Sequence, residues 1–431
     1  MPPRRSPFIG LLEGALKLGR AARVAGPWQL DKDALMESAT AETGLDDFGD
    51  AWFEQPMEQL IGSLNNEAAL NTAGQFTAYQ SFRKVLKDRL RAQYWFARHP
   101  EILARPIPRP VVIVGPMRSG TTRLHRLLAS DQRFSHMRSF ETISPVPPMD
   151  FERVMAGAIP DPRPAIARQI MRAARLANPR TLSIHPTGPF APEEELGLFF
   201  HSFWGMKYEA QWQVPSYGRW CEGQDAAPAY DQLARLLKLV GWSQQTSSIR
   251  PWILKTPQHM LDIPALLRAF PDARLIFTHR EPQAFVGSAA SLAWNQSIIY
   301  SNDVCAKQVG REWLGKSALQ IERMRAGRVG LAPERMIDVH YDEMEHDWRG
   351  TMERIYGFLG FDIAPAWAGM EDFLERSKAL KRHPHRYSLA EFGLDEQEVD
   401  ARFARYIEDF GIPQSARAAR VQGRARKAVN A

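Results

Sequence analysis

The fold of this chain is decided by residues 111–122, which read VVIVGPMRSGTT from Val111 to Thr122. Four apolar, mostly β-branched residues predict a buried parallel strand, and the glycine-bracketed turn after them leads into a helical pattern. The unpaired N–H groups at the start of that helix, together with the helix dipole, favour a negatively charged guest. The stretch therefore predicts a strand, a loop and a helix that together bind a phosphate group.

The loop departs at one position from the phosphate-binding loop of nucleotidases. Gly115 and Gly120 have the spacing of that motif, but Thr121 stands where such an enzyme carries its lysine. Thr122 takes the hydroxyl position, and Arg118 is the nearest cation. A turn without any ligand is the alternative, although the run of Arg, Ser, Gly and two Thr residues favours phosphate binding.

The composition is that of a globular protein, with 44% hydrophobic and 24% charged residues in a chain of 431. Two cysteines are too few for a disulfide framework or a zinc site and indicate a reducing compartment. The net charge is +6, and the basic tail after Ser415 carries most of it, which argues against nucleic acid as a partner. No apolar run approaches about 20 residues and no signal-peptide core is present, so we expect a cytoplasmic protein without a membrane span.

Helical patterns flank a central α/β region. Helical periodicity runs from Phe8 to about His99, with its longest segment over residues 77–96, and a proline-rich run then leads to the strand at Val111. Helical patterns return over residues 348–359 and 395–410. We therefore divide the chain into a helical N-terminal extension (residues 1–104), an α/β core (105–345) and a C-terminal helical segment with a basic tail (346–431).

Three more strands are predicted inside the core. One apolar segment ends at Lys255, a second spans Ala273–Thr278, and a third spans Met336–His340. A helical pattern separates the first two, and another begins at Pro282. This alternation predicts a parallel sheet in a three-layer α/β/α fold.

Two other regions carry candidate groups. Glu141 follows the first helix of the core at the carboxyl edge of the predicted sheet, where open α/β folds place their sites, and a solvated loop carboxylate is the alternative. Pro192 and three glutamates, including Glu194, open a predicted helix over residues 196–204, where acids ordinarily stabilise the helix dipole. The aromatic residues between Phe199 and Trp220 are typical of a core and are also suited to lining a pocket for an apolar acceptor.

Three blocks of the core resemble the sulfotransferases that use 3′-phosphoadenosine 5′-phosphosulfate, and the resemblance covers about residues 105–345. The run Arg118-Ser119-Gly120-Thr121-Thr122 is similar to the 5′-phosphosulfate loop of that family. Arg280, with Ser288 eight residues further on, is similar to its 3′-phosphate site. The segment 254–259, Leu-Lys-Thr-Pro-Gln-His, resembles its Lys-Thr-His segment.

The resemblance implies an enzyme that moves a sulfonyl group from this donor, without a metal, to a hydroxyl or amine of a small apolar alcohol, phenol or amine. Lys255 would lie near the bridging oxygen, and His259, two places further from it than in the cytosolic branch, would be the base. Other branches use a glutamate after the first helix, which here is Glu141, and Glu194 is a further candidate. His385 and Arg386 would replace the basic C-terminal loop that covers the adenosine phosphates.

The chemistry of this reaction suits the residue types. Backbone N–H groups after Gly115, with Arg118 and Lys255, can stabilise a phosphate leaving group, and Arg280 offers a planar fork to a 3′-phosphate. Imidazole exchanges protons readily near neutral pH, which makes His259 the first candidate for the base. Two alternatives stay open: a P-loop kinase or nucleotidase, which needs a loop lysine and magnesium, and a nucleotide-binding protein of the same fold without catalysis.

Overall fold

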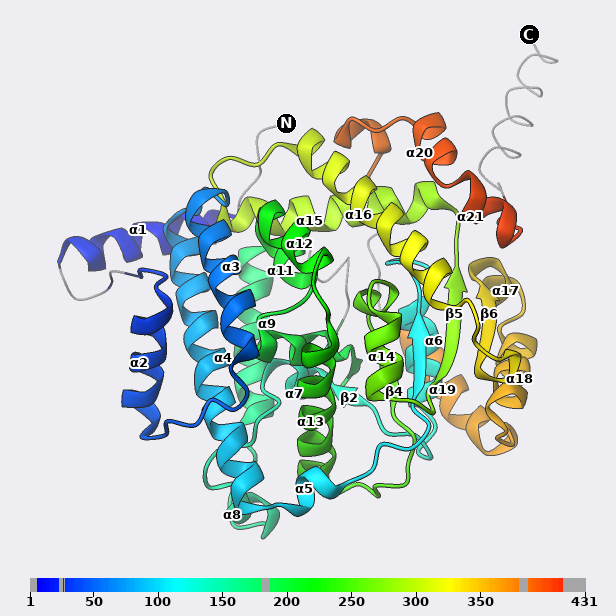
Figure 1. Ribbon diagram of the computed structural model, residues 1–431, viewed down its shortest axis with the longest axis horizontal. Coiled ribbons are helices and arrows are strands. Elements are labelled where there is room, and N and C mark those ends of the chain that lie inside the picture. The colour runs from blue at the N-terminus through cyan, green and yellow to red at the C-terminus, as the bar shows by residue number, and fades with distance from the viewer. Residues whose placement is uncertain (1–5, 23–25, 27, 180–186, 380–386, 414–431) are drawn as a thin grey trace.

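The computed structural model describes residues 6–22, 26, 28–179, 187–379 and 387–413. It contains a parallel sheet of four strands, which lies right of centre in Figure 1. The strands lie in the order β4 (Ile253–Lys255), β1 (Val111–Val114), β5 (Arg274–His279) and β6 (Met336–His340). Because β1 lies between β4 and β5, the loop after β1 opens between the ends of two neighbouring strands.

Helices cover both faces of the sheet, and the side chains of β1 alternate between them. Val112 and Val114 face one core, and Val111 and Ile113 face the other. The first core is shared with helices α13 (Ala227–Ser243), α14 (Ile263–Ala269), α15 (Pro282–Tyr300) and α16 (Ala306–Gly327). The second is shared with α6 (Thr121–Ala129), α18 (Trp348–Leu359) and α19 (Trp367–Ala379). The predicted three-layer α/β/α fold is confirmed.

The N-terminal helices pack beside the sheet rather than on it, as Figure 1 shows on its left side. They are α1 (Pro7–Ala21), α2 (Lys32–Thr43), α3 (Glu54–Asn66), α4 (Thr72–Arg98) and α5 (Glu101–Ala104). Helix α4 is the long helix predicted over residues 77–96, and it begins earlier because the side chain of Asn71 accepts a hydrogen bond from Gly74 N at 2.7 Å. Its Phe82 ring packs 4.9 Å from Phe203, which joins the extension to the core.

An insertion between α6 and β4 carries the acidic segment. It contains β2 (Met137–Arg138), α7 (Ser139–Ile143), α8 (Phe151–Met155), α9 (Arg163–Ala177), β3 (Pro192–Glu193), η2 (Glu195–Ser202), α11 (Lys207–Gln211) and α12 (Pro215–Glu222). The predicted helix over residues 196–204 is the 3₁₀ helix η2. A Cβ on Gly197 would lie 2.2 Å from the carbonyl oxygen of Thr142, so η2 is held against α7 more closely than any larger residue would allow.

Most of the aromatic residues predicted as core or pocket wall are core. Phe199, Phe203, Trp204, Trp212 and Tyr217 are all almost completely buried. They fill the space between the N-terminal helices and α13, and their rings contact one another or neighbouring aromatic rings. The core interpretation of this cluster is therefore confirmed.

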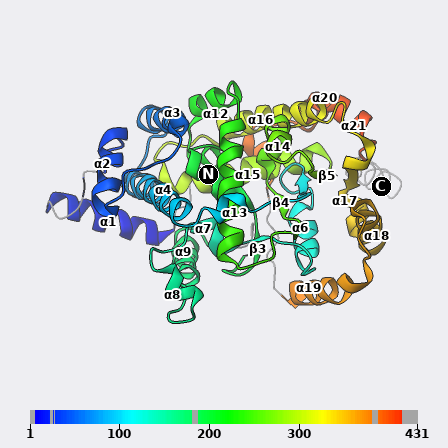
Figure 2. The same ribbon diagram turned by 60° about the horizontal axis from the view of Figure 1, so that its bottom comes forward.

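The C-terminal segment returns to the carboxyl ends of the strands. Helix α17 (Tyr341–His346) ends the core, and the C-terminal segment includes α20 (Glu396–Arg402) and α21 (Ala404–Asp409), which Figure 2 shows beside α16 and β5. The single helix predicted over residues 395–410 is broken at Phe403, whose ring packs edge-on against Phe285 of α15 at 5.3 Å. Within the described ranges, no helix is long and apolar enough to cross a membrane. The basic tail after Ser415 lies outside them.

Candidate active site

The loop after β1 is built on close backbone contacts. A Cβ on Gly115 would lie 1.9 Å from Thr278 Oγ1, so only glycine lets β1 end this close to β5. The hydroxyl of Ser119 donates to the carbonyl of Pro116 at 2.7 Å and lies 2.7 Å from Thr278 Oγ1. Ser119 thus closes the loop on itself and ties it to β5.

Two loop residues adopt left-handed backbone conformations. Gly120 has φ +85° and needs no Cβ, whereas Arg118 has φ +70° and carries strain of about 1 kcal/mol. This geometry leads directly into α6, whose first residues are Thr121 and Thr122. Strained loops at helix N-termini are typical of ligand-binding sites, because the unpaired N–H groups converge on the space above the loop.

The end of β4 holds an ion pair next to this loop. The buried ammonium of Lys255 pairs with Oε1 of Glu194 and lies 3.4 Å from Thr122 Oγ1. Glu194 follows the two-stranded ribbon of β2 and β3, and its carbonyl accepts a hydrogen bond from Thr142 at 2.7 Å. Its side chain keeps 19% of its surface exposed. The pair therefore places a cation and a partly open carboxylate at the start of α6.

A buried chain of three side chains lies behind Lys255. Glu195 accepts a hydrogen bond from the backbone N–H of Lys255 at 2.9 Å, and its other oxygen lies 2.6 Å from Nε2 of His259. The hydroxyl of Tyr230 lies 2.9 Å from Nδ1 of the same ring. Because a carboxylate only accepts, Nε2 of a neutral His259 must donate, and Nδ1 then accepts from Tyr230. Burial raises the pKa of Tyr230, so its hydroxyl keeps the proton that it donates.

The geometry separates the three predicted base candidates. His259 is completely buried and both ring nitrogens already have partners. Glu141 is also completely buried, and it accepts from Arg138 N at 2.8 Å and from Gln244 at 2.8 Å. Glu194 alone of the three is partly exposed beside the lysine and the loop.

At the end of β5, Arg280 crosses the loop. Its Nη1 donates to the carbonyl of Arg118, and its guanidinium lies 3.8 Å from the centre of the Tyr341 ring. A cavity of about 200 Å³ opens on this side, lined among others by Arg280, Tyr341 and His340. Tyr341 follows β6, and its ring also lies against Gly120, where a Cβ would come within 3.2 Å. The guanidinium group of Arg280 thus lies between the loop and the ring of Tyr341.

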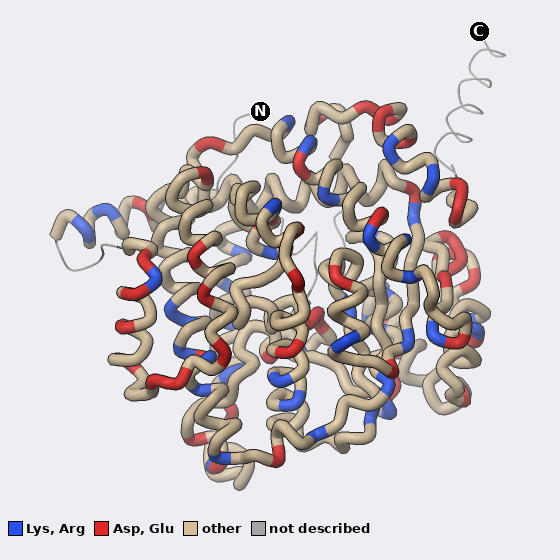
Figure 3. The backbone as a smooth tube through the Cα atoms, in the orientation of Figure 1, with Lys and Arg blue, Asp and Glu red and all other residues tan. Residues whose placement is uncertain are grey.

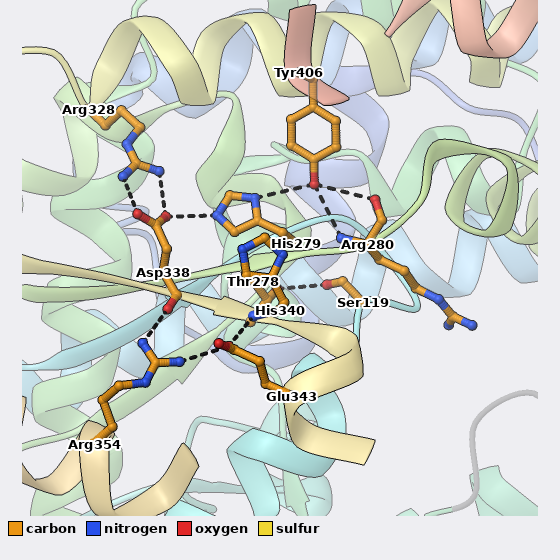
Figure 4. A network of polar contacts seen from close by, with 10 residues as sticks. All are labelled: Ser119, Thr278, His279, Arg280, Arg328, Asp338, His340, Glu343, Arg354 and Tyr406. Atoms are coloured by element: carbon orange, nitrogen blue, oxygen red, sulfur yellow. Dashed lines mark hydrogen bonds and ion pairs between the residues drawn. The ribbon is translucent and has the colours of Figure 1, made fainter. Parts of the chain in front are cut away.

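A second chain of side chains lies behind Arg280 (Figure 4). Arg328 donates two hydrogen bonds of 2.7 Å to Asp338, and Asp338 Oδ1 lies 2.7 Å from Nε2 of His279. Nδ1 of His279 lies 3.3 Å from the hydroxyl of Tyr406, which accepts from the backbone N–H of Arg280 at 3.3 Å. Burial lowers the pKa of His279, although the hydrogen bond that it makes to Asp338 opposes this, so the ring is neutral and its Nε2 donates to Asp338. Its Nδ1 is then an acceptor, and the Tyr406 hydroxyl has two acceptors within reach, this nitrogen and the carbonyl oxygen of Arg280 at 3.4 Å.

The remaining predicted residues lie beside Arg280 or outside the described ranges. Ser288 is buried on α15, the helix that follows Arg280. The hydroxyl of Tyr387 donates to the carbonyl of Ala284 at 2.7 Å, and a hydrogen bond from Ser288 opposes the rise that burial causes in the Tyr387 pKa. His385 and Arg386 lie outside the described residues.

Comparison with known proteins defines the class. A sequence profile of the sulfotransferase family matches residues 110–365, more than half of the chain, and the chain therefore belongs to that family. The predicted family, the fold class and an enzyme of this class are confirmed. Membership favours sulfonyl transfer over the kinase or nucleotidase alternative.

Three similar proteins are sulfotransferases from mycobacteria. Sulfotransferase STF1 from Mycobacterium tuberculosis H37Rv is 30% identical and superimposes with a TM-score of 0.73 over 86% of this chain and 98% of its own. Sulfotransferase STF9 from Mycobacterium avium is 26% identical, with a TM-score of 0.78 over 88% and 97%. The omega-hydroxy-beta-dihydromenaquinone-9 sulfotransferase Stf3 of Mycobacterium bovis is 22% identical over 331 residues, which cover 72% of this chain and 77% of that protein.

Sequence reasoning missed the residues behind the two cations. Glu195 was interpreted only as a dipole-stabilising acid, and Tyr230 and Tyr406 had no motif around them. Asp338, a carboxylate inside the predicted strand Met336–His340, is a signal that could have indicated the second chain. A carboxylate in a strand that lies partly buried against a core is expected to have a hydrogen-bond partner.

Proposed function

We propose that the sulfonyl donor of this enzyme is 3′-phosphoadenosine 5′-phosphosulfate, bound at the carboxyl ends of β1, β4 and β5. The cradle left by Gly115 and Gly120 and the N–H groups of α6 suit the 5′-phosphosulfate. Arg118 would add a positive charge there. The fork of Arg280, with Ser288 and Tyr387 beside it, suits a 3′-phosphate.

One observation carries the proposal for catalysis: the Lys255–Glu194 pair next to Thr122. In the reaction, the acceptor oxygen or nitrogen forms a bond to sulfur, and the bond from sulfur to the bridging oxygen breaks. Adenosine 3′,5′-bisphosphate leaves with the electron pair of that bond. The Lys255 ammonium would stabilise the negative charge that develops there.

The acceptor must also lose a proton, and we infer that Glu194 takes it. Its carboxylate keeps 19% of its surface exposed beside the ammonium, so an acceptor can approach it from solvent, whereas His259 and Glu141 are completely buried. His259 was the first candidate from the sequence. In the neutral state its lone pair points to Tyr230, which leaves it a positioning role through Glu195. Glu141 is bound to Arg138 and Gln244 and would need to break those contacts.

For the acceptor we propose a small lipophilic molecule with a hydroxyl or amine. The name of the Stf3 relative describes a hydroxylated menaquinone, an alcohol on a long apolar body. In this chain Phe190, four residues before Glu194, leaves 58% of its surface exposed and packs edge-on against Phe140 at 5.7 Å. An apolar side chain at this place fits an acceptor with an apolar body. The cytoplasmic location predicted from the sequence stays a prediction.

Calorimetry with three nucleotides tests the donor. Adenosine 3′,5′-bisphosphate should bind tightly, AMP more weakly because it lacks the 3′-phosphate, and ATP with magnesium weakest. A preference for ATP with magnesium would overturn the proposal. Turnover is then measured with labelled donor and a panel of hydroxylated lipids, phenols and amines; incorporation only into highly polar acceptors would contradict the lipophilic class.

A further inference from the structure

Helix α1 has an apolar face that nothing in the described structure covers. Its inner side packs on α4 and α9, with Ile9 buried. Its outer side carries Pro7, Leu11, Ala15 and Leu18, and the two leucines keep 75% and 74% of their surface exposed. A helix that is apolar on both sides is normally buried on both sides. The outer side of α1 therefore lacks the apolar environment that its residues would need.

The neighbouring helix α9 extends the same feature. The two helices meet where the hydroxyl of Ser6 donates to the carbonyl of Leu176 at 2.6 Å. On α9, Ile166, Ile170 and Leu176 are 42%, 43% and 54% exposed. Of the nine large apolar side chains that are exposed in the described residues, five thus lie on α1 and α9. Such a concentration is typical of a docking surface rather than of scattered surface residues.

The exposed charges on these two helices have one sign. Lys17 and Arg20 lie on α1, and Arg168, Arg172 and Arg175 lie on α9, where there is no acidic residue at all. Glu13 is the one carboxylate on the two helices, and it is partly buried. Figure 1 shows α1 projecting from the left edge of the molecule, and Figure 3 shows the distribution of charge in the same orientation. Apolar side chains flanked by Lys and Arg match the surface of a bilayer that contains anionic lipid.

We propose that α1 and α9 attach this enzyme to an anionic membrane surface, with the apolar side chains at the acyl boundary and the cations among the headgroups. A second copy of the chain fits the surface less well. A two-fold dimer places the same patch on itself, so the five cations would face the same five cations. Like charges brought together across an interface disfavour association, whereas anionic headgroups neutralise them.

Co-sedimentation with sucrose-loaded vesicles tests the proposal on the full chain. We expect binding to phosphatidylcholine vesicles that contain phosphatidylglycerol, weak binding to phosphatidylcholine alone, and loss of binding in high salt. Leu11→Ser with Leu18→Ser should lower the partition coefficient by about tenfold or more. Arg168→Gln with Arg172→Gln should lower it by about fivefold per arginine, and only on anionic vesicles.

The control pair is Ile249→Ser with Val329→Ser, which changes two apolar residues that are 76% and 82% exposed elsewhere on the molecule. It should bind vesicles like the unmodified protein. Circular dichroism and bisphosphate affinity, unchanged in all variants, would show that each is folded. The proposal is overturned if the unmodified protein does not sediment with anionic vesicles. It is also overturned if the variants of α1 and α9 bind as strongly as the unmodified protein, which is the result expected if the basic tail alone binds the vesicles. It is also overturned if light scattering shows a dimer that Leu11→Ser with Leu18→Ser dissociates.

Discussion

The ends of β4 and β5 are each supported by a chain of hydrogen-bonded side chains. Both chains contain a carboxylate, an imidazole and a phenol, but in opposite order. Behind Lys255 the order is carboxylate, imidazole and phenol, so Glu195 contacts the strand and Tyr230 lies furthest away. Behind Arg280 the phenol of Tyr406 contacts the backbone instead. Both chains fix a backbone N–H, and through it the position of a cation at the edge of the sheet.

The difference between the chains lies in burial. All members of the first chain are buried, and they belong to the insertion, α13 and the segment after β4. In the second, the Asp338 side chain is 38% exposed, and Tyr406 comes from α21, outside the part of the chain that the family profile matches. The first chain is therefore a fixed part of the core, whereas the second depends on a contact with the C-terminal segment. We expect catalysis to depend on the end of β4 and donor affinity to depend on the end of β5.

The largest effect should come from Glu194→Gln. The amide cannot accept the acceptor's proton, so we expect kcat to fall by about 10²–10⁴ while bisphosphate affinity stays within about twofold. His259→Gln should instead lower stability and leave most of the turnover, because His259 acts through Glu195. Glu193→Gln, one residue away in β3, is the matched control. Loss of turnover in His259→Gln but not in Glu194→Gln would reverse our assignment of the base.

Arg280→Ala should weaken adenosine 3′,5′-bisphosphate by roughly 2–5 kcal/mol, the cost of removing one partner of a desolvated charge pair. AMP affinity should change little, since AMP lacks the 3′-phosphate. Arg123→Ala is the control, because that arginine lies on α6 and pairs with Glu345 at 2.9 Å. Calorimetry with both nucleotides measures the effect; an equal loss for the two would mean that Arg280 acts on the loop through Arg118 and not on the 3′-phosphate.

Local sequence patterns predicted the strands well. They did not predict which side chains contact the residues at the strand ends. Strands β1 and β6 have the predicted bounds, because a run of β-branched residues between turn signals determines a strand locally. The contacts nearest to the two cations join residues that are far apart in the sequence: Glu194 lies 61 residues from Lys255, and Tyr406 lies 126 from Arg280. Periodicity does not encode such contacts, because they exist only after the sheet and its covering helices have packed.

The role of His259 illustrates the same limit. Its position near Lys255 in the sequence suggested that it acts as the base. Whether a histidine can act as a base depends on which groups occupy its two ring nitrogens. Those partners, Glu195 and Tyr230, come from η2 and α13. The sequence therefore indicated a functionally important histidine near β4. It did not indicate whether that histidine faces the acceptor or the core.

A smaller effect is expected for Tyr406→Phe. Loss of the hydroxyl leaves the Arg280 N–H and His279 Nδ1 without this partner, at a cost of about 1 kcal/mol. If the chain positions Arg280, this loss should appear as a bisphosphate affinity lowered roughly fivefold with AMP affinity unchanged. Tyr356→Phe removes a buried hydroxyl that donates to Asp131 at 2.9 Å on the other face of the sheet, and should lower stability only. A drop in stability without the affinity change would leave Tyr406 a purely structural residue.

The smallest effect concerns pH and tests whether Asp338 works as a charge. Burial raises the pKa of Asp338, but hydrogen bonds from His279 and Arg328 outweigh it and hold that pKa well below its usual range. A lowered carboxyl pKa stabilises the folded state above the unfolded value of about 3.9, and this contribution is lost as the pH falls through it. The difference in unfolding free energy between the unmodified protein and Asp338→Asn should therefore stay constant from about pH 8 to pH 5, and shrink below about pH 4. After screening by solvent at this half-buried site, we expect the change to be at most about 1 kcal/mol.

Urea unfolding at each pH measures this difference in unfolding free energy. If the difference instead grows as the pH falls from about 7 to about 6, Asp338 stabilises the fold by pairing with a protonated His279, whose Nδ1 would then donate to Tyr406 rather than accept from it.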